Sequence, residues 1–242
     1  MSGRIGYYGG IVKDGLVLNL DAGKKDSYNR VGTSWNDISG NNYSGTLTNG
    51  PTFNSNNGGS IVFDGSDDNV NLGVSNNLIT FGTNPFSINL WLYPTNIGVS
   101  GGYQTILSTY NDYNSGFGTY FLMAIFNNAG VYTGIGMLDA PGNFLGGQSS
   151  GFALSLTNNT WVNVCFTRNG SNFIGYLNGV STKTLSTATD WTGTGRNIKI
   201  GGGVTSIGSY KGNIPNLTIY NKTLSATEVL QNYNALKGRF NL

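Results

Sequence analysis

The stretch that decides the fold is Trp161-Val-Asn-Val-Cys-Phe-Thr-Arg-Asn-Gly-Ser-Asn-Phe-Ile-Gly-Tyr-Leu-Asn-Gly179. Asn169-Gly170 is the preferred pair for a two-residue type I′ hairpin turn, because both positions of that turn take φ > 0. A turn at this point places Arg168 opposite Ser171 and Phe166 opposite Phe173. The stretch therefore predicts two antiparallel strands joined by a tight turn.

This register divides the hairpin into two faces, because successive side chains of a strand point to opposite sides. The face assigned to the core carries Val162, Val164, Phe166, Phe173 and Leu177. The other face carries Trp161, Cys165, Ile174 and Tyr176. The second face is too apolar to be fully solvated, so either another layer covers it or it is a binding surface. Cys165 is expected to be an inert buried thiol.

Further short strands are predicted on both sides of the hairpin. In Phe86–Tyr93, apolar residues alternate with others at a period of two, which indicates a strand with one face in the core. The other predicted strands are 15–20, 60–63, 104–110, 120–126, 131–138, 198–201 and 214–220. The Asn- and Gly-rich ranges 39–50 and 54–59 are expected to be long loops. Many short strands separated by turns favour an all-β sandwich or barrel.

One helix is predicted near the end of the chain. Ser225-Ala-Thr-Glu228 forms a capping box, in which each side chain bonds the other residue's backbone N–H. Val229, Leu230, Tyr233 and Leu236 follow at helical spacing. Gly238 is expected to end the helix.

The composition excludes several classes of site. The 242 residues include no His, one Cys and eleven acids, of which only Glu228 is a glutamate. A Ser-His-Asp triad, a His-ligated zinc site and an intrachain disulfide are therefore excluded. Charged residues make up 10% of the chain and the net charge is +2, so no nucleic-acid partner is expected. The first residues contain no apolar run of about 7–15 residues, so no signal peptide is expected. No apolar stretch is long enough to be expected to span a membrane.

Seven ordered motifs resemble laminin-G-like domains of the concanavalin A-like lectin/glucanase superfamily. They are Trp35-Asn-Asp-Ile-Ser-Gly-Asn-Asn42, Gly45-Thr-Leu-Thr-Asn-Gly-Pro-Thr-Phe53, Gly59-Ser-Ile-Val-Phe-Asp-Gly-Ser-Asp-Asp68, Phe86-Ser-Ile-Asn-Leu-Trp-Leu92, Trp161-Val-Asn-Val164, Tyr176-Leu-Asn-Gly179 and Ile219-Tyr-Asn-Lys-Thr-Leu-Ser-Ala-Thr-Glu-Val229. The resemblance spans roughly residues 15–236. It implies an all-β jelly-roll sandwich of two antiparallel sheets with one short C-terminal helix. The subtype also resembles virion proteins of tailed bacteriophages.

The chain departs from this family in two places. Glucanases of the superfamily carry Glu-x-Asp-x-Glu on one strand, which a chain with a single Glu cannot reproduce. The usual Gly-x-Ile-Asp-Glu of the last strand is here Gly212-Asn-Ile-Pro-Asn216. Any activity that depends on those acids is in doubt.

Two groups of residues are candidate ligand sites. Asp64, Asp67, Asp68 and Asn69 offer oxygen ligands for Ca²⁺, although the same residues suit an ordinary capped turn. The aromatic and amide-rich segment around Tyr110, Asp112, Tyr113 and Asn114 is a candidate carbohydrate site, with a packed loop as the alternative. No catalytic residue and no cofactor other than this calcium ion is predicted.

The domain prediction is an N-terminal arm, residues 1–14, followed by one domain, residues 15–242. Arg4, Tyr7 and Tyr8 of the arm are candidate contacts with a neighbouring subunit, and an end lying on its own domain is the alternative.

The composition, the absent export signal and the resemblance together favour a non-catalytic virion structural protein, located in the virion. Its partners would be other virion proteins, with a homo-oligomer as one arrangement. The alternative is a carbohydrate-binding or host receptor-binding module, and a glycoside hydrolase is the third reading.

Overall fold

The computed structural model describes residues 9–74, 78–79, 81–97, 102–109, 121–128, 132–138, 154–186, 197–202 and 208–242. The strands in chain order are β1 Leu16–Asp21, β2 Ser34–Trp35, β3 Gly45–Thr48, β4 Thr52–Asn54, β5 Ser60–Asp64, β6 Asn69–Val74, β7 Phe86–Pro94, β8 Tyr103–Ser108, β9 Leu122–Asn128, β10 Tyr132–Leu138, β11 Leu154–Ser155, β12 Val162–Asn169, β13 Asn172–Leu177, β14 Val180–Ser186, β15 Asn197–Ile200, β16 Gly208–Ser209 and β17 Lys211–Tyr220. The helical elements are the 3₁₀ turn η1 Asn56–Gly58, the helix α1 Ala226–Leu236 and the 3₁₀ turn η2 Lys237–Phe240.

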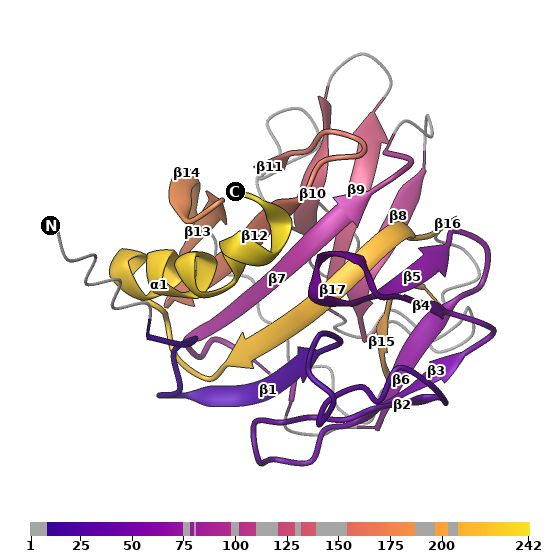
Figure 1. The fold of residues 1–242 in the computed structure, drawn as a ribbon. Helices are drawn as coiled ribbons and strands as arrows, with labels where there is room; N and C mark the ends of the chain where they lie inside the picture. Colours follow the sequence, from indigo (N-terminus) through magenta and orange to yellow (C-terminus); the bar gives the residue numbers. More distant parts are fainter. Residues whose placement is uncertain are drawn as a thin grey trace, which may run out of the picture.

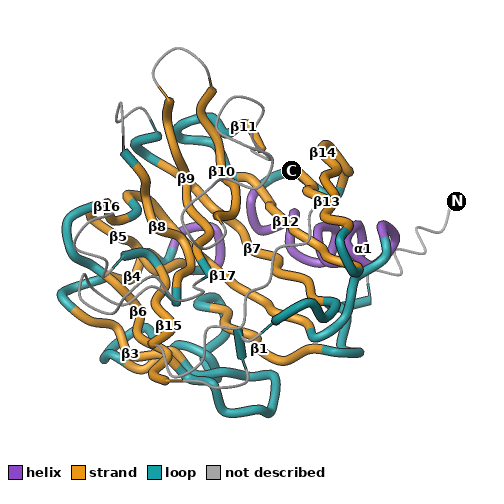
Figure 2. Tube along the Cα trace, turned by 180° about the vertical axis from the view of Figure 1, so that it is seen from behind, coloured by secondary structure: helices purple, strands orange, loops and turns teal. Residues whose placement is uncertain are grey.

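The strands form two sheets. The first sheet has the order β14-β13-β12-β7-β17-β5-β4, with β1 paired to β17. The second has the order β11-β10-β9-β8-β15-β6-β3-β2, with β16 paired to β8. Among the described pairs, only β16 and β8 run parallel. Figure 1 views the first sheet from its outer side with α1 in front of it, and Figure 2 shows the second sheet from behind. The predicted two-sheet all-β sandwich with one C-terminal helix is confirmed.

The main core lies between the two sheets. Ile88, Leu90 and Leu92 of β7 are almost fully buried there, and they face residues of the second sheet such as Met123 and Ile125 of β9. At about 25 cal/mol per Å² of apolar surface removed from water, this burial is the main stabilising term.

The prediction of a strand with one face in the core is confirmed for β7, and its other face is buried as well, beneath the C-terminal segment. Trp91, on the outer face, is 0% exposed. Its indole ring stacks on Phe240 with centroids 4.3 Å apart and on Tyr233 with centroids 5.5 Å apart. The period of two reports the direction of side chains, but it does not report how many layers cover the sheet.

The hairpin of β12 and β13 has the predicted faces in a different register. Arg168 lies opposite Phe173 instead of Ser171, because the two-residue loop is Gly170-Ser171. The shift is two residues, so every side chain keeps its predicted face. The Asn-Gly turn with two positive φ values occurs instead at Asn178 (φ 50°) and Gly179 (φ 79°), between β13 and β14.

The outer, apolar face of this hairpin is covered by the chain's own ends. Cys165 and Tyr176 pack with Val12, Leu224 and Val229 in a second apolar cluster. The cover is therefore another layer, as one of the two sequence readings has it. Burial raises the pKa of the Cys165 thiol far above its usual range, which agrees with an inert thiol.

The capping box of α1 is confirmed. The Ser225 hydroxyl accepts a bond from the Glu228 N–H (3.3 Å), and the Glu228 carboxylate accepts one from the Ser225 N–H (2.9 Å). Gly238 does not end the helix as predicted. The α-helix stops at Leu236 and the chain tightens into the 3₁₀ turn η2, which contains Gly238.

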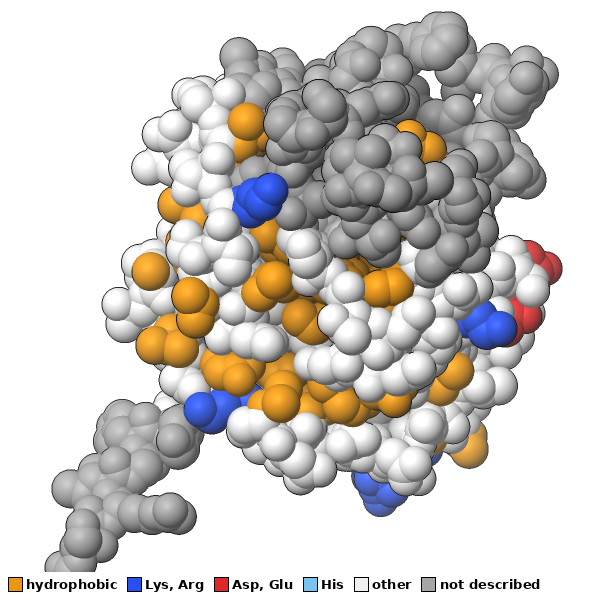
Figure 3. Space-filling model, turned by 90° about the horizontal axis from the view of Figure 1, so that it is seen from above, with side chains coloured by type: hydrophobic (Ala, Val, Ile, Leu, Met, Phe, Trp, Pro, Cys, Tyr) orange, Lys and Arg blue, Asp and Glu red, His pale blue; other side chains and the backbone are white. Residues whose placement is uncertain are grey.

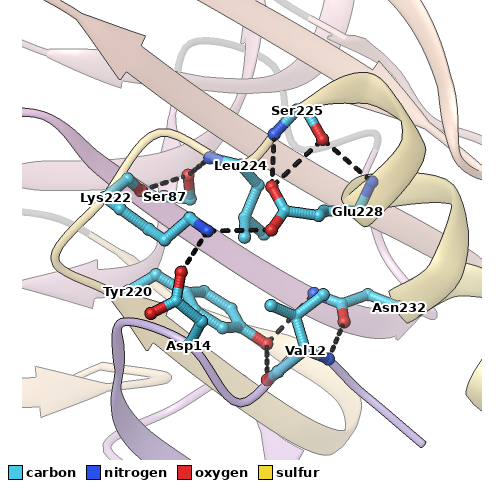
Figure 4. A network of polar contacts seen from close by, with 9 residues as sticks. All are labelled: Val12, Asp14, Ser87, Tyr220, Lys222, Leu224, Ser225, Glu228 and Asn232. Carbon is cyan, nitrogen blue, oxygen red and sulfur yellow. Dashed lines mark hydrogen bonds and ion pairs between the residues drawn. The ribbon is translucent and has the colours of Figure 1, made fainter. Parts of the chain in front are cut away.

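Residues 9–14 lie against α1 and the end of β17 (Figure 4). The Val12 N–H donates to Asn232 Oδ1 at 2.8 Å, and the Tyr220 hydroxyl donates to the Val12 carbonyl at 3.2 Å. Lys222 Nζ bridges Asp14 (2.6 Å) and Glu228 (2.8 Å). The bonds of Val12 and Asp14 join segments more than 200 residues apart in the sequence.

Two expected loops contain regular structure. Strand β3 lies inside the range 39–50, so the prediction of a continuous loop there was wrong. The range 54–59 contains η1. No helix within the described ranges is long and apolar enough to cross a membrane.

We expect Trp91→Ala to destabilise the protein by about 3–5 kcal/mol, because it removes a buried indole and leaves a cavity under η2. Chemical denaturation followed by circular dichroism measures the loss. Leu230→Ala is the control, because Leu230 is 44% exposed on α1 and should change stability by less than about 0.5 kcal/mol. Equal stabilities of the two variants would show that the ring stack does not hold the C-terminal segment.

Candidate functional site

A cleft of about 340 Å³ lies where the start of β1, the end of β17 and the segment before β7 meet. Its volume is near the lower end of the range of about 300–1,000 Å³ that ligand pockets occupy. The residues that line it are Val17, Leu78, Phe81, Asn84, Pro85, Ile219, Tyr220 and Asn221.

The wall before β7 is built on an aromatic support. The Phe81 ring stacks on Phe86 with centroids 3.8 Å apart and planes 13° apart, and the edge of Phe121 packs against it at 5.7 Å. Phe81 to Asn84 form a tight turn, closed by a bond from the Asn84 N–H to the Phe81 carbonyl of 2.8 Å. Gly82 at the second position has φ 52°, which favours glycine. Asn84 and Pro85 are thereby presented to solvent at the rim of the cleft.

The polar groups of the cleft are neutral. Tyr220 directs its hydroxyl away to Val12 and Asn232 (Figure 4). Burial raises the pKa of Tyr220 to about 12, so this phenol stays protonated at neutral pH and cannot act as a base. Asn84 and Asn221 supply the amides of the lining, and none of the lining residues is acidic or basic. The cleft can therefore accept or donate hydrogen bonds to a neutral ligand and offers no group for acid–base chemistry.

The acidic residues predicted as a calcium site come together in the connection between β5 and β6. This connection crosses from the first sheet to the second, because β5 and β6 belong to different sheets. Carboxylate oxygens of Asp64, Asp67 and Asp68 lie within 4.8 Å of one another. The Asn69 side chain instead donates to the Asp67 carbonyl at 3.1 Å.

Several of these oxygens also serve the turn. Asp68 accepts the Asp64 N–H at 2.9 Å, and Asp64 accepts the Ser66 N–H at 2.7 Å. The geometry thus accommodates both readings of the sequence, a cation held by three carboxylates and a capped turn. Calcium binding at Asp64, Asp67 and Asp68 stays a prediction.

Asp68 is the buried member of the group, at 4% exposure. Burial raises the pKa of its carboxyl above the usual range, and the neighbouring charges of Asp64 and Asp67 raise it further. Ionised Asp68 is therefore less favourable in the folded protein than in the unfolded chain.

The remaining predicted site residues lie outside the described residues. These are Tyr110, Asp112, Tyr113 and Asn114 of the carbohydrate prediction and Arg4, Tyr7 and Tyr8 of the arm. Sequence reasoning missed the cleft, because its lining comes from three separate parts of the chain. The short Phe81-Gly-Thr-Asn84 turn is the one local signal that was available.

A family model described as concanavalin A-like lectin/glucanases superfamily matches residues 64–230, more than half of the chain. No curated protein matches the chain. Many solved structures do match it.

One of these structures is domain 4 of AbnA, a GH43 extracellular arabinanase from Geobacillus stearothermophilus, in complex with arabinotriose. It has a TM-score of 0.64 and 17% identity over 90% of this chain and 98% of that one. Two others are the binding domain of Paraclostridial Mosquitocidal Protein 1 (0.62, 17%, 92% of this chain) and a mutant of Trypanosoma rangeli sialidase displaying trans-sialidase activity (0.63, 13%, 93%). This chain covers 52% and 33% of the latter two. At these identities the likeness shows the fold.

These comparisons correct the main functional prediction. The three structures named above are an arabinanase domain, the binding domain of a mosquitocidal protein and a sialidase, and none of the three is a virion protein. The reading as a bacteriophage virion structural protein was wrong, and the alternative of a carbohydrate-binding module fits better.

We expect Asp68→Asn to raise the melting temperature at pH 7 relative to the wild type, because the amide oxygen keeps the bond from the Asp64 N–H without a buried charge. A raised folded-state pKa means that stability falls as pH rises from the ordinary Asp value of about 3.9 through the raised value. The advantage of Asp68→Asn should therefore vanish below about pH 4. Thermal scans between these pH values measure it.

Asp26→Asn, which changes an exposed carboxylate, is the control for this series. A variant Asp68→Asn that is less stable than the wild type at pH 7 would contradict the unfavourable burial of the ionised group. The same scans with Ca²⁺ test the cation prediction, since bound Ca²⁺ should stabilise the wild type more than Asp68→Asn.

Proposed function

Because the chain belongs to the concanavalin A-like lectin/glucanases superfamily, we propose that it is a non-catalytic carbohydrate-binding module. Its ligand is a neutral saccharide held in the cleft between β1, β17 and residues 78–85. The observation that carries the proposal is the lining of this cleft, which combines apolar walls and two amides with no ionisable acid or base.

The chemistry of the lining suits sugars. Asn84 and Asn221 each offer an N–H donor and a carbonyl acceptor, which match hydroxyl groups in both roles. Val17 and Pro85 are the apolar lining residues with accessible surface, and they suit the C–H surface of a sugar ring. A charged ligand would meet no counter-charge among the lining residues.

The same lining argues against hydrolysis. Glycosidases place two carboxylates about 5–9.5 Å apart on either side of the scissile bond. No acid lines this cleft, and the grouped carboxylates of Asp64, Asp67 and Asp68 lie within 4.8 Å of one another in the β5–β6 connection. The arrangement supports binding without turnover.

The surface and one structural neighbour give further support. Among the described residues on the face shown in Figure 3, the side chains of Lys, Arg, Asp and Glu are few and scattered. Domain 4 of the arabinanase AbnA, which shares this fold, was solved in complex with arabinotriose. A domain of this architecture therefore accommodates a neutral oligosaccharide.

We expect isothermal titration with neutral oligosaccharides, arabinotriose among them, to detect binding that Asn84→Ala and Asn221→Ala each weaken by about 2- to 10-fold, the worth of one hydrogen bond. Asn172→Ala is the matched control, because Asn172 is an exposed asparagine of β13 that does not line the cleft. Raising NaCl to about 1 M should leave the affinity unchanged, because no charge pair is involved.

Two results would overturn the proposal. One is the absence of binding to any member of a neutral glycan array. The other is binding that all three Asn variants retain equally, which would place the saccharide elsewhere on the protein.

A further inference from the structure

We infer that Arg168 is the positioning residue of the cleft, through a hydrogen bond from its guanidinium group to the Gly82 carbonyl in the turn that forms one wall. This inference rests on the proposed function for its ligand. That Arg168 fixes the turn depends only on contacts within the protein and not on the identity of the ligand.

Arg168 is an unusual residue for its place. It lies near the end of β12 on the face that points into the sandwich, and it is 1% exposed. Arginine is almost never fully buried unless its donors are matched. Burying a guanidinium group is costly unless oriented hydrogen-bond acceptors surround it.

The structure supplies such acceptors from two separate segments. Nη1 donates to the Gly82 carbonyl at 2.6 Å and Nε donates to the Gly170 carbonyl at 2.7 Å. The two acceptors belong to the turn before β7 and to the β12–β13 loop. The guanidinium carbon lies 5.0 Å from the centroid of the Phe173 ring, which adds a cation–π contact. The Thr223 hydroxyl donates to the Arg168 carbonyl, so the backbone at this point is fixed as well.

The Gly82 carbonyl is the link to the cleft. Gly82 is the second residue of the turn from Phe81 to Asn84, and its φ of 52° lies in the left-handed region that favours glycine. Phe81 and Asn84 of this turn both line the cleft, as does the next residue, Pro85. Arg168 itself does not line the cleft, so it acts on a ligand only through the turn.

Aromatic packing also connects Arg168 to the turn from Phe81 to Asn84. Arg168 pairs with Phe86 across β12 and β7. Phe173 packs edge-on against Phe86 at 6.2 Å, and Phe86 in turn stacks on Phe81. The guanidinium group and the ring stack thus approach the turn from two directions, one through its backbone and one through its first side chain.

Arg168→Lys tests the role of the planar guanidinium fork. Lysine keeps the charge and most of the stem, but it cannot direct two fixed donors to two carbonyls. In the wild type, the backbone N–H of Asn84 is protected from hydrogen exchange by its bond to the Phe81 carbonyl. We expect hydrogen exchange of peptides covering residues 81–86 to become at least about tenfold faster in Arg168→Lys, as for loss of a hydrogen bond to a charged group.

The control is a variant of similar global stability whose change lies in the other sheet. Ile200→Val alters a buried residue of β15, and Ile200→Ala is a larger step of the same kind if a closer match of melting temperatures is needed. Faster exchange at 81–86 in Arg168→Lys, but not in the matched Ile200 variant, supports the inference. Equal exchange at 81–86 in the two variants overturns it.

Ligand binding gives the second readout. Saccharide affinity should fall by about tenfold or more in Arg168→Lys at a temperature where the variant is fully folded, and it should be unchanged in the Ile200 control. If the wild type binds no neutral glycan, the proposed function fails, whereas hydrogen exchange still decides the role of Arg168. If Arg168→Lys binds the saccharide as well as the wild type does, the positioning role is wrong and the proposed function stands.

Discussion

Burial of β7 on both faces is the constraint on which the other parts of the structure depend. Its inner side chains Ile88 and Leu90 pack against the second sheet, and its outer Trp91 packs beneath η2. Its first residue, Phe86, stacks on Phe81 and so supports the cleft. One strand therefore contacts the core, the wall of the candidate cleft, and the C-terminal segment of α1 and η2 that lies over the outer face of the first sheet, here called the C-terminal cover. A shift of β7 would disturb all three.

The C-terminal cover is a compromise between apolar stacking and buried polar groups. Within the described part of the chain, Asn89 Nδ2, Trp91 Nε1, Asn163 Oδ1 and Asn216 Oδ1 are buried without a hydrogen-bond partner. Each such group costs on the order of 1–3 kcal/mol. The ring stack over Trp91 offsets part of this cost.

Ion pairs hold the two ends of the C-terminal cover. Arg239 bonds Asp21 at 2.8 Å and the Gly59 carbonyl at 3.0 Å, while Lys222 joins Asp14 to the helix cap at Glu228. Because both of its ends are fixed, the C-terminal cover stays over the polar outer face of the first sheet. Apolar packing alone would hold it there less firmly.

The sequence predicted those parts of the fold that repeat a local pattern. Alternation identified β7, β12 and β13, and the capping box identified α1, because each pattern reports its own geometry over a few residues. The hairpin register was missed because Asn-Gly occurs twice within residues 161–179, at 169–170 and 178–179, and the local preference is equal at both. Strand β14 was missed because it is an exposed edge strand with no apolar alternation. Its strand character comes from pairing with β13, which no local pattern records.

The cleft could not be predicted, because distant segments form it and no motif links them. Val17, Asn84 and Asn221 have no shared signal in the sequence, and only the pairing of β1 with β17 brings the first and last together. What the composition predicted was the absence of a nucleic-acid partner. A chain with 10% charged residues has little means of attracting ions over distance.

At the proposed saccharide site, recognition depends on shape and on neutral hydrogen bonds. Neutral bonds are individually weak, since each replaces a bond to water. Their contribution grows when the groups that make them are already in place, because binding then costs less conformational entropy. This requirement explains why a rigid turn behind Asn84 matters more here than it would in a charged site. A buried cation that holds a backbone carbonyl meets that requirement without placing its charge in the cleft.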